Sequence, residues 1–164
     1  MPTARLDLPD AIATEAAGAR LAVGLGGGMI VTLSGDLGAG KTTMVRGCLR
    51  ALGWSGPVKS PTYPLVELYP LSSLYFYHFD FYRFADPSEW ETAGLADYFG
   101  PHAVCLVEWP ERVAGRLPTP DLELTLSYPF DASLPGRELA LSAHTEGGER
   151  CLAAMTSVQA GPTA

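Results

Sequence analysis

The sequence predicts a single-domain α/β fold, in which helices flank a mixed β-sheet and a β-hairpin lies near the C-terminus. Short runs typical of strands alternate along the chain with longer helix-like segments. A glycine-rich turn follows the apolar run MIVTL at 29–33 and leads into a helix-like stretch that starts near residue 42. The 164 residues suffice for one domain with its own core, expected at 1–156, and the remainder, 157–164, is expected to be a flexible tail.

Helices are expected where a capping residue precedes a run of helix formers. Asp10 is a suitable N-cap for an Ala-rich segment that ends near residue 23. Asp86, Pro87 and Glu89 form a strong helix start, because Pro87 suits the first turn and Glu89 completes a capping box. The expected helices span 10–23, 42–52, 86–99 and 148–155.

Strands are expected where apolar and polar residues alternate, or where β-branched apolar residues form short runs. The expected strands span 4–8, 29–33, 65–69, 74–84, 103–107, 122–128 and 138–142, and the last two form the hairpin. In the stretch YHFDFYRF at 77–84, aromatic residues alternate with His78, Asp80 and Tyr82, which predicts a half-buried strand. Its aromatic face is expected in the core. The other face is either a solvated surface or part of a site.

Composition narrows the classes of function. The formal net charge is −7 and the chain has two lysines, which argues against a surface that binds DNA. No apolar run approaches the roughly 20 residues of a membrane span, and the N-terminus lacks the pattern of a signal peptide. Three cysteines without a CxxC pair are expected to be buried thiols. The chain is therefore expected to be cytoplasmic, with neither a membrane nor DNA as a partner.

The segment GDLGAGKT at 35–42 matches GxxxxGK[ST], the P-loop pattern. Small residues let backbone N–H groups approach phosphates closely, and the helix that follows favours negative charge at its N-terminus. Lys41 is expected to reach the β and γ phosphates, Thr42 to bind Mg²⁺ and Thr43 to reach the α phosphate. The expected nucleotide-binding residues of the loop are Leu37, Gly38, Ala39, Gly40, Lys41, Thr42 and Thr43. The motif between a strand and a helix predicts a P-loop NTPase-like fold.

The expected nucleotide is ATP. GTPases read guanine with an [NT]KxD motif, which needs an aspartate two residues after a lysine. Thr43 stands at that distance from Lys41, and Pro61 stands at that distance from Lys59. The [NT]KxD motif for guanine recognition is therefore absent from the sequence, and ATP with Mg²⁺ is the expected ligand.

Two acidic residues are candidates for organising Mg²⁺. P-loop enzymes place such a carboxylate at the end of a buried strand, and Glu108 follows the apolar run at 103–107. Asp80 is the second candidate, and either residue could instead be an ordinary surface acid. The hydroxyls of Ser60 and Thr62 lie in a proline-rich loop, which is either a plain turn or a segment that senses the γ phosphate.

Five segments, taken in order and with their spacing, carry a resemblance to a known family. They are GDLGAGKTT at 35–43, SPTY at 60–63, HFDFYR at 78–83, DPSEWETAGLADYF at 86–99 and VEWPER at 107–112. Together they resemble the bacterial TsaE (YjeE) family, the ATPases of tRNA threonylcarbamoyladenosine biosynthesis. A P-loop alone is generic, whereas this ordered set is specific.

The resemblance implies a Mg²⁺-dependent ATPase. Its intrinsic activity is expected to be low, because no arginine of the sequence is clearly placed as a finger in cis. It implies that Ser60 and Thr62 belong to a switch-like loop and that Asp80 takes part in the metal and water shell. The implied metal ligands are Thr42, Asp80 and Glu108, and the implied catalytic residues are Lys41, Thr62, Asp80 and Glu108. Two further nucleotide contacts are implied, from Arg137 in a Gly-Arg turn and from the backbone of Ala11 near the adenine.

The resemblance also implies partners. These are the TsaD and TsaB proteins, whose complex the family is thought to reset through ATP binding and hydrolysis. Contact with tRNA is expected to be indirect only. Two other functions remain open from the residues alone: a P-loop kinase of small molecules, and a nucleotide-dependent binding module that does not hydrolyse ATP.

Overall fold

A seven-stranded sheet organises the computed structural model, which describes residues 1–61 and 65–157. The strands are β1 (Thr3–Leu8), β2 (Ile30–Ser34), β3 (Val66–Pro70), β4 (Tyr75–Asp80), β5 (Ala103–Glu108), β6 (Leu122–Ser127) and β7 (Arg137–Ala143). Their order across the sheet is β1-β7-β6-β2-β5-β4-β3. The four central strands run parallel, β3 pairs antiparallel with β4, and β7 pairs antiparallel with β6 and β1. The predicted mixed sheet and C-terminal hairpin are confirmed.

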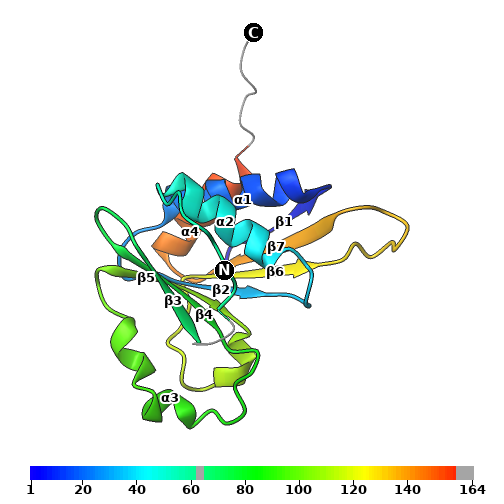
Figure 1. Cartoon of the computed structure of the whole chain (residues 1–164). Coiled ribbons are helices and arrows are strands. Elements are labelled where there is room, and N and C mark those ends of the chain that lie inside the picture. Colours follow the sequence, from blue (N-terminus) through cyan, green and yellow to red (C-terminus); the bar gives the residue numbers. More distant parts are fainter. Residues whose placement is uncertain (62–64, 158–164) are drawn as a thin grey trace.

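Helices cover both faces of the sheet (Figure 1). One face carries α1 (Ala11–Gly24), α2 (Lys41–Ala51) and α4 (Glu146–Thr156). The other face carries α3 (Glu89–Thr92) and the 3-10 helices η1 (Leu95–Tyr98) and η2 (Pro110–Val113). Within the described part of the chain, no helix is long and apolar enough to span a membrane. Most of the tail predicted at 157–164 lies outside the described residues.

Two further local predictions are confirmed, a helix cap and the state of the cysteines. The Asp10 carboxylate caps α1 by accepting a hydrogen bond from the backbone N–H of Ala13 at 2.8 Å. Cys48, Cys105 and Cys151 are buried free thiols, as predicted. Burial raises the pKa of the Cys105 thiol to about 12. Burial is also the largest of the effects that together raise the pKa of the Cys151 thiol to about 11.

Strand β4 is buried on both faces, so the expected half-buried strand is wrong. Phe79 packs into the core beneath α3, together with Phe81 just beyond the strand, which confirms the aromatic face. The opposite face carries Phe76, which packs into the core under α1 and α2, and His78, which is 0% exposed. Because β4 lies inside the sheet with a helical layer on each side, neither face is left to water.

The strand predicted at 74–84 is shorter in the structure. β4 ends at Asp80, whose carboxylate accepts a hydrogen bond from the backbone N–H of Tyr82 at 2.9 Å. This bond turns the chain away from the sheet directly after the strand. As a result, Asp80 lies at the sheet edge where the parallel strands end.

The continuous helix predicted at 86–99 is also wrong. Two short helices, α3 and η1, take its place, and Gly94 lies between them with φ +65°. The predicted capping box does not form, because Ser88 is the N-cap and makes no side-chain cap bond. The Asp86 carboxylate instead accepts from the backbone N–H of Ser88 at 2.9 Å. Local turn formation has therefore replaced a longer helix.

Helices α1 and α2 approach each other closely, and a glycine lies on each side of their contact. A Cβ at Gly18 would overlap the carbonyl oxygen of Met44 in α2, and one at Gly47 would overlap the carbonyl oxygen of Glu15 in α1. Both overlaps involve backbone atoms, which cannot turn aside as a flexible side chain can. The backbones of the two helices are therefore in direct contact at this crossing.

Gly47→Ala is expected to destabilise the fold by about 2 kcal/mol, which lowers Tm by about 6 °C, because the new methyl group forces α1 and α2 apart. Differential scanning calorimetry measures this change. Gly100→Ala is the matched control, because a Cβ there meets nothing within 4 Å. An unchanged Tm for Gly47→Ala would show that the helices separate at no cost.

Candidate functional site

The glycine-rich turn places the N-terminus of α2 at the end of β2, as the motif predicts. Gly40 is the N-cap of α2 and has φ +104°, a left-handed conformation that side-chain-bearing residues rarely adopt. The first helical residue is Lys41, so the free N–H groups of the first turn lie next to the loop. Such a turn is suited to binding an anion.

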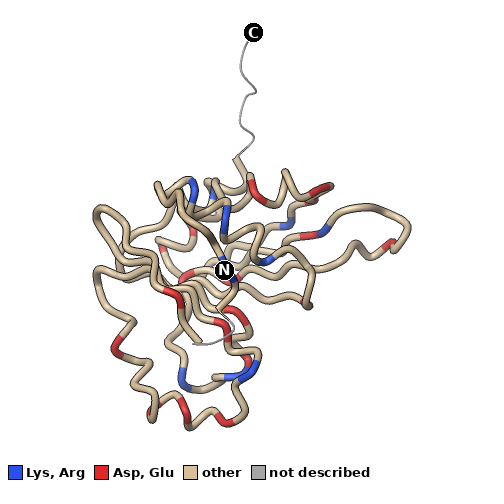
Figure 2. The backbone as a smooth tube through the Cα atoms, in the orientation of Figure 1, with Lys and Arg blue, Asp and Glu red and all other residues tan. Residues whose placement is uncertain are grey.

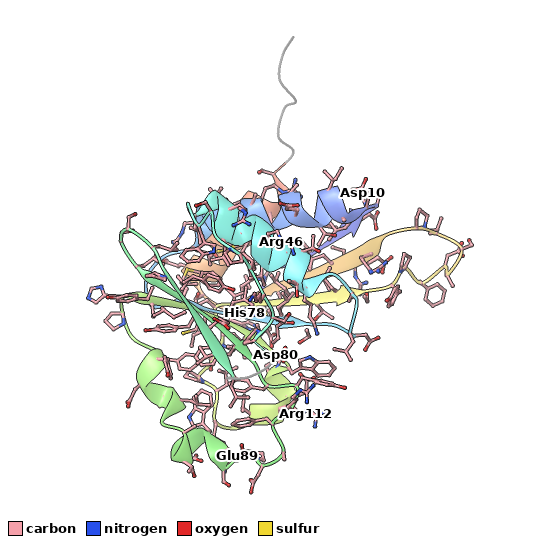
Figure 3. The ribbon with its side chains drawn as sticks, in the orientation of Figure 1. Asp10, Arg46, His78, Asp80, Glu89 and Arg112 are labelled. Carbon is pink, nitrogen blue, oxygen red and sulfur yellow. The ribbon has the colours of Figure 1, made fainter. Side chains whose placement is uncertain are left out.

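A cleft of about 510 Å³ opens in front of this turn. It brings together most of the predicted site residues, namely Leu37, Gly38, Gly40, Lys41, Thr42, Thr43, Ser60, Asp80 and Glu108. Thr62 lies outside the described residues, so its place is not described. Figure 3 shows the position of Asp80 within this arrangement, on β4 and below α2. The volume and the mixture of cation, hydroxyls and carboxylates suit a phosphorylated ligand.

Lys41 and Glu108 form a buried ion pair at the back of the cleft. Their side chains are 7% and 2% exposed, and Lys41 Nζ lies 3.6 Å from Glu108 Oε1. The ammonium group also donates to the carbonyl oxygen of Gly35 at 2.5 Å. Glu108 is thus no surface acid, and its charge is compensated within the protein.

Asp80 lies beside Glu108, because the two residues are register partners on the parallel strands β4 and β5. Burial is the main cause that raises the pKa of Asp80, and the charge of Glu108 raises it further. The backbone N–H of Tyr82 acts in the opposite direction, as do the nearby His78 and Lys41. Two neighbouring carboxylates of this kind are stabilised by a nearby cation.

The residues of the cleft fit a magnesium ion that is shared with phosphates. Among the described residues, no group of three or more His, Cys, Asp and Glu side chains could hold a metal alone. Mg²⁺, however, is usually bound through one or two carboxylates, waters and substrate phosphates. Asp80, Glu108 and the hydroxyl of Thr42 lie around one cleft and meet that requirement. The Thr42 hydroxyl lies 2.6 Å from the hydroxyl of Ser60, which links the helix to the following loop.

Asp80→Asn is expected to stabilise the protein at pH 7, measured with EDTA and without nucleotide. Folding raises the pKa of Asp80 above its ordinary 3.8, so ionisation costs the folded state stability. The penalty is absent below pH 3.8 and grows as the pH rises through the folded-state pKa. The gain is expected to stay below about 1 kcal/mol, because water screens this partly exposed group.

Urea unfolding at several pH values tests this expectation. The difference between variant and wild type should shrink as the pH falls through the folded-state pKa toward 3.8, and below that value Asp80 becomes largely neutral in both states. A variant that is less stable than the wild type at pH 7 would contradict the raised pKa.

Trp109 and Tyr82 form an aromatic wall of the cleft, which the sequence motifs alone did not establish. Their ring centroids lie 5.0 Å apart, and Lys41 Nζ lies 4.6 Å from the Trp109 ring centroid. Trp109 has φ +56° and is the one non-glycine residue with positive φ in the described ranges. A non-glycine residue held in such a backbone conformation is commonly found at functional sites. Arg83 also lines the cleft.

A smaller cavity of about 290 Å³ lies on the other side of the P-loop. Ala11, at the start of α1, and Arg137, at the start of β7, both line it together with Gly38, Gly40 and Thr43. The two residues implied by resemblance alone are thus adjacent to the loop. Figure 3 marks the nearby Asp10, which caps the helix that begins at this cavity.

Arg137 is bound to the P-loop itself. Its Nε donates to the carbonyl oxygen of Ala39 at 3.2 Å, and Nη2 donates to that of Gly38 at 3.3 Å. Its guanidinium carbon lies 4.2 Å from the centroid of the Tyr128 ring. By binding two loop carbonyls, Arg137 helps to hold the peptide planes of the loop in place.

Comparison with known proteins agrees with this geometry. Residues 8–135 match the family model described as "Threonylcarbamoyl adenosine biosynthesis protein TsaE". A Haemophilus influenzae protein named tRNA threonylcarbamoyladenosine biosynthesis protein TsaE is 46% identical over 129 residues, which cover 79% of each chain. The protein of that name from Bacillus subtilis is 40% identical over 116 residues, which cover 71% of this chain and 70% of that one.

The fold is similar to that of a solved structure as well. A crystal structure of Bacillus subtilis YdiB superposes with a TM-score of 0.78 and 28% sequence identity, and the match covers 94% of both chains. The family match at residues 8–135 includes the P-loop, β4 and β5, which carry the cleft. The chain therefore belongs to the TsaE family of threonylcarbamoyl adenosine biosynthesis proteins.

Proposed function

We propose that this chain is a Mg²⁺-dependent ATPase that supports tRNA threonylcarbamoyladenosine formation by binding and resetting the TsaD–TsaB complex. The observation that carries the proposal is the convergence of a buried lysine, a hydroxyl and two carboxylates on one cleft at the N-terminus of α2. Lys41, Thr42, Asp80 and Glu108 come from three separate elements, and all four line that cleft.

Each of these groups has a proposed role that follows from its chemistry. The N–H groups of the P-loop and Lys41 bind the phosphates of ATP. Thr42 and Glu108 hold Mg²⁺, which neutralises phosphate charge when bound. Asp80, which lies beside Glu108 and whose pKa is raised by burial, would take part in the metal and water shell and help to orient the attacking water. Trp109 covers the phosphate side of the cleft.

The smaller cavity is proposed to receive the base side of the nucleotide. Ala11 and Arg137 line it, and it shares Gly38, Gly40 and Thr43 with the larger cleft. A nucleotide can therefore cross the loop from one cavity to the other. The backbone at Ala11 is the proposed contact to adenine.

The proposed partners are proteins, and contact with tRNA is proposed to be indirect. The net charge is −7, and Figure 2 shows Lys and Arg spread along the backbone with many Asp and Glu among them. A protein that binds nucleic acid directly usually concentrates positive charge on one face. Membership of the TsaE family supports a role in the cytoplasmic modification pathway.

Phosphate release from Mg-ATP tests the proposal, for the chain alone and with TsaD and TsaB added. Slow release that rises at least about tenfold with the partners is expected, because assembly supplies or orders missing catalytic groups. ATP binding without release in either condition would favour the non-hydrolysing binding module instead. Transfer of the γ phosphate to an added small metabolite would favour a kinase.

A further inference from the structure

We propose that His78 is a positioning residue that holds the Glu108 carboxylate in its working orientation. The inference rests on the proposed function, since Glu108 matters there as a ligand of Mg²⁺. His78 Nε2 lies 2.5 Å from Glu108 Oε2, and the two side chains are 0% and 2% exposed. His78 is neither a predicted ligand of the nucleotide nor a residue that lines the cleft.

The position of His78 is largely apolar. On β4 it shares a face with Phe76, and its register partners are Leu106 on β5 and Glu67 on β3. Phe76 and Leu106 are buried in the core under α2, and the hydrogen bond of the His78 ring goes to Glu108. A polar ring in such a place costs stability unless its hydrogen bonds are made. The bond to Glu108 is therefore what distinguishes histidine from an apolar residue here.

The two ring nitrogens of His78 differ in their surroundings. Nε2 is bound to Glu108, whereas the buried Nδ1 has no hydrogen-bond partner among the residues that the structure describes. Because a carboxylate oxygen can only accept a hydrogen bond, the proton shared in this contact belongs to His78 Nε2. His78 thus acts as a hydrogen-bond donor to the carboxylate.

As a result, the two carboxylate oxygens of Glu108 have different partners. Oε2 is occupied by His78, while Oε1 lies 3.6 Å from Lys41 Nζ, on the side of the cleft. If Lys41 binds phosphate, His78 remains as the group that fixes the carboxylate plane. Partners of metal-binding residues typically act in this way, and their loss costs about 10- to 100-fold in metal affinity or activity.

The test compares His78→Leu with His78→Gln in the full chain. Leucine removes the donor, whereas the glutamine amide nitrogen reaches about as far as Nε2 and can restore it. His144→Leu is the matched control, because His144 Nε2 also binds a glutamate, at 2.7 Å from Glu123 Oε2. That pair is partly exposed and does not line the cleft. The readout is the ratio of ADP affinities with Mg²⁺ and with EDTA, measured by calorimetry.

His78→Leu is expected to lower the Mg²⁺-dependent gain in ADP affinity about 10-fold and to leave the affinity in EDTA unchanged. His78→Gln should recover most of the gain. The Mg²⁺ concentration needed for half-maximal phosphate release should be highest for His78→Leu and close to the wild-type value for His78→Gln. A purely structural role would instead lower both affinities together, or lower only Tm.

Three results would overturn the inference: a wild-type Mg²⁺ effect in His78→Leu, no recovery in a folded His78→Gln, or an equal effect of His144→Leu. If His78→Leu does not fold, His78→Asn replaces it, because its shorter amide cannot reach Glu108. A wild-type chain that binds no nucleotide would instead refute the proposed function. A wild type that binds nucleotide but does not hydrolyse it would leave the affinity ratio as a valid test.

Discussion

Lys41→Ala is expected to weaken ATP binding about 100-fold, because the variant loses a buried, charge-assisted contact to the phosphates. Lys41 is 7% exposed and already held by Gly35 and Glu108, so its ammonium group is positioned at the cleft before any ligand arrives. Its removal also leaves Glu108 without a compensating cation, which repels the phosphates. Both effects act in the same direction.

Titration calorimetry with ATP and Mg²⁺ measures this loss, on a variant that circular dichroism shows to be folded, because Lys41→Ala also removes one partner of a buried ion pair. Lys59→Ala is the matched control, because Lys59 is the other lysine of the chain and its side chain is exposed. Its affinity should equal that of the wild type. An affinity of Lys41→Ala within about threefold of the wild type would contradict the assignment of the P-loop.

Glu108→Gln is expected to reduce phosphate release at least about 100-fold while the protein stays folded, because a neutral amide binds Mg²⁺ poorly. Glutamine has the same length, and its amide oxygen can still accept from His78 Nε2. Alanine is the poorer test, since removal of one partner of a buried ion pair commonly costs about 3–5 kcal/mol of stability. The amide therefore separates the loss of charge from unfolding.

Steady-state phosphate release with TsaD and TsaB, together with circular dichroism, provides the measurement. Glu123→Gln serves as the control, because Glu123 also pairs with a histidine but lies on β6 away from the cleft. If a folded Glu108→Gln variant releases phosphate at the wild-type rate, Glu108 does not hold the metal.

The phosphate-binding part of the site was predictable because it is encoded locally. The P-loop needs only small residues, a lysine and a hydroxyl between one strand and one helix, and all of these are contiguous in the sequence. The position of Glu108 followed from a second local pattern, an acid directly after an apolar strand. Because parallel strands end at the same edge of a sheet, the P-loop after β2 and the acid at the end of β5 are expected to lie close together.

The parts that sequence reasoning missed depend on contacts between distant segments. The polar residues of β4 suggested an outer face, but the burial of His78 is decided by α2 above it and by Glu108 on the neighbouring strand. Likewise, the 86–99 segment had good helix signals, yet Trp90 and Leu95 both enter the core beneath the sheet. The turn at Gly94 between α3 and η1 lets both side chains reach the core, and the local sequence pattern does not predict this turn.

The backbone contact between α1 and α2 has a consequence for the cost of binding. The N-terminus of α1 borders the smaller cavity and the N-terminus of α2 borders the larger cleft. Because no side chain lies between the backbones at Gly18 and Gly47, backbone atoms set the separation of the two helices at this crossing. A ligand that reaches both cavities meets two walls that are already preorganised, so little of its binding energy is spent on ordering them.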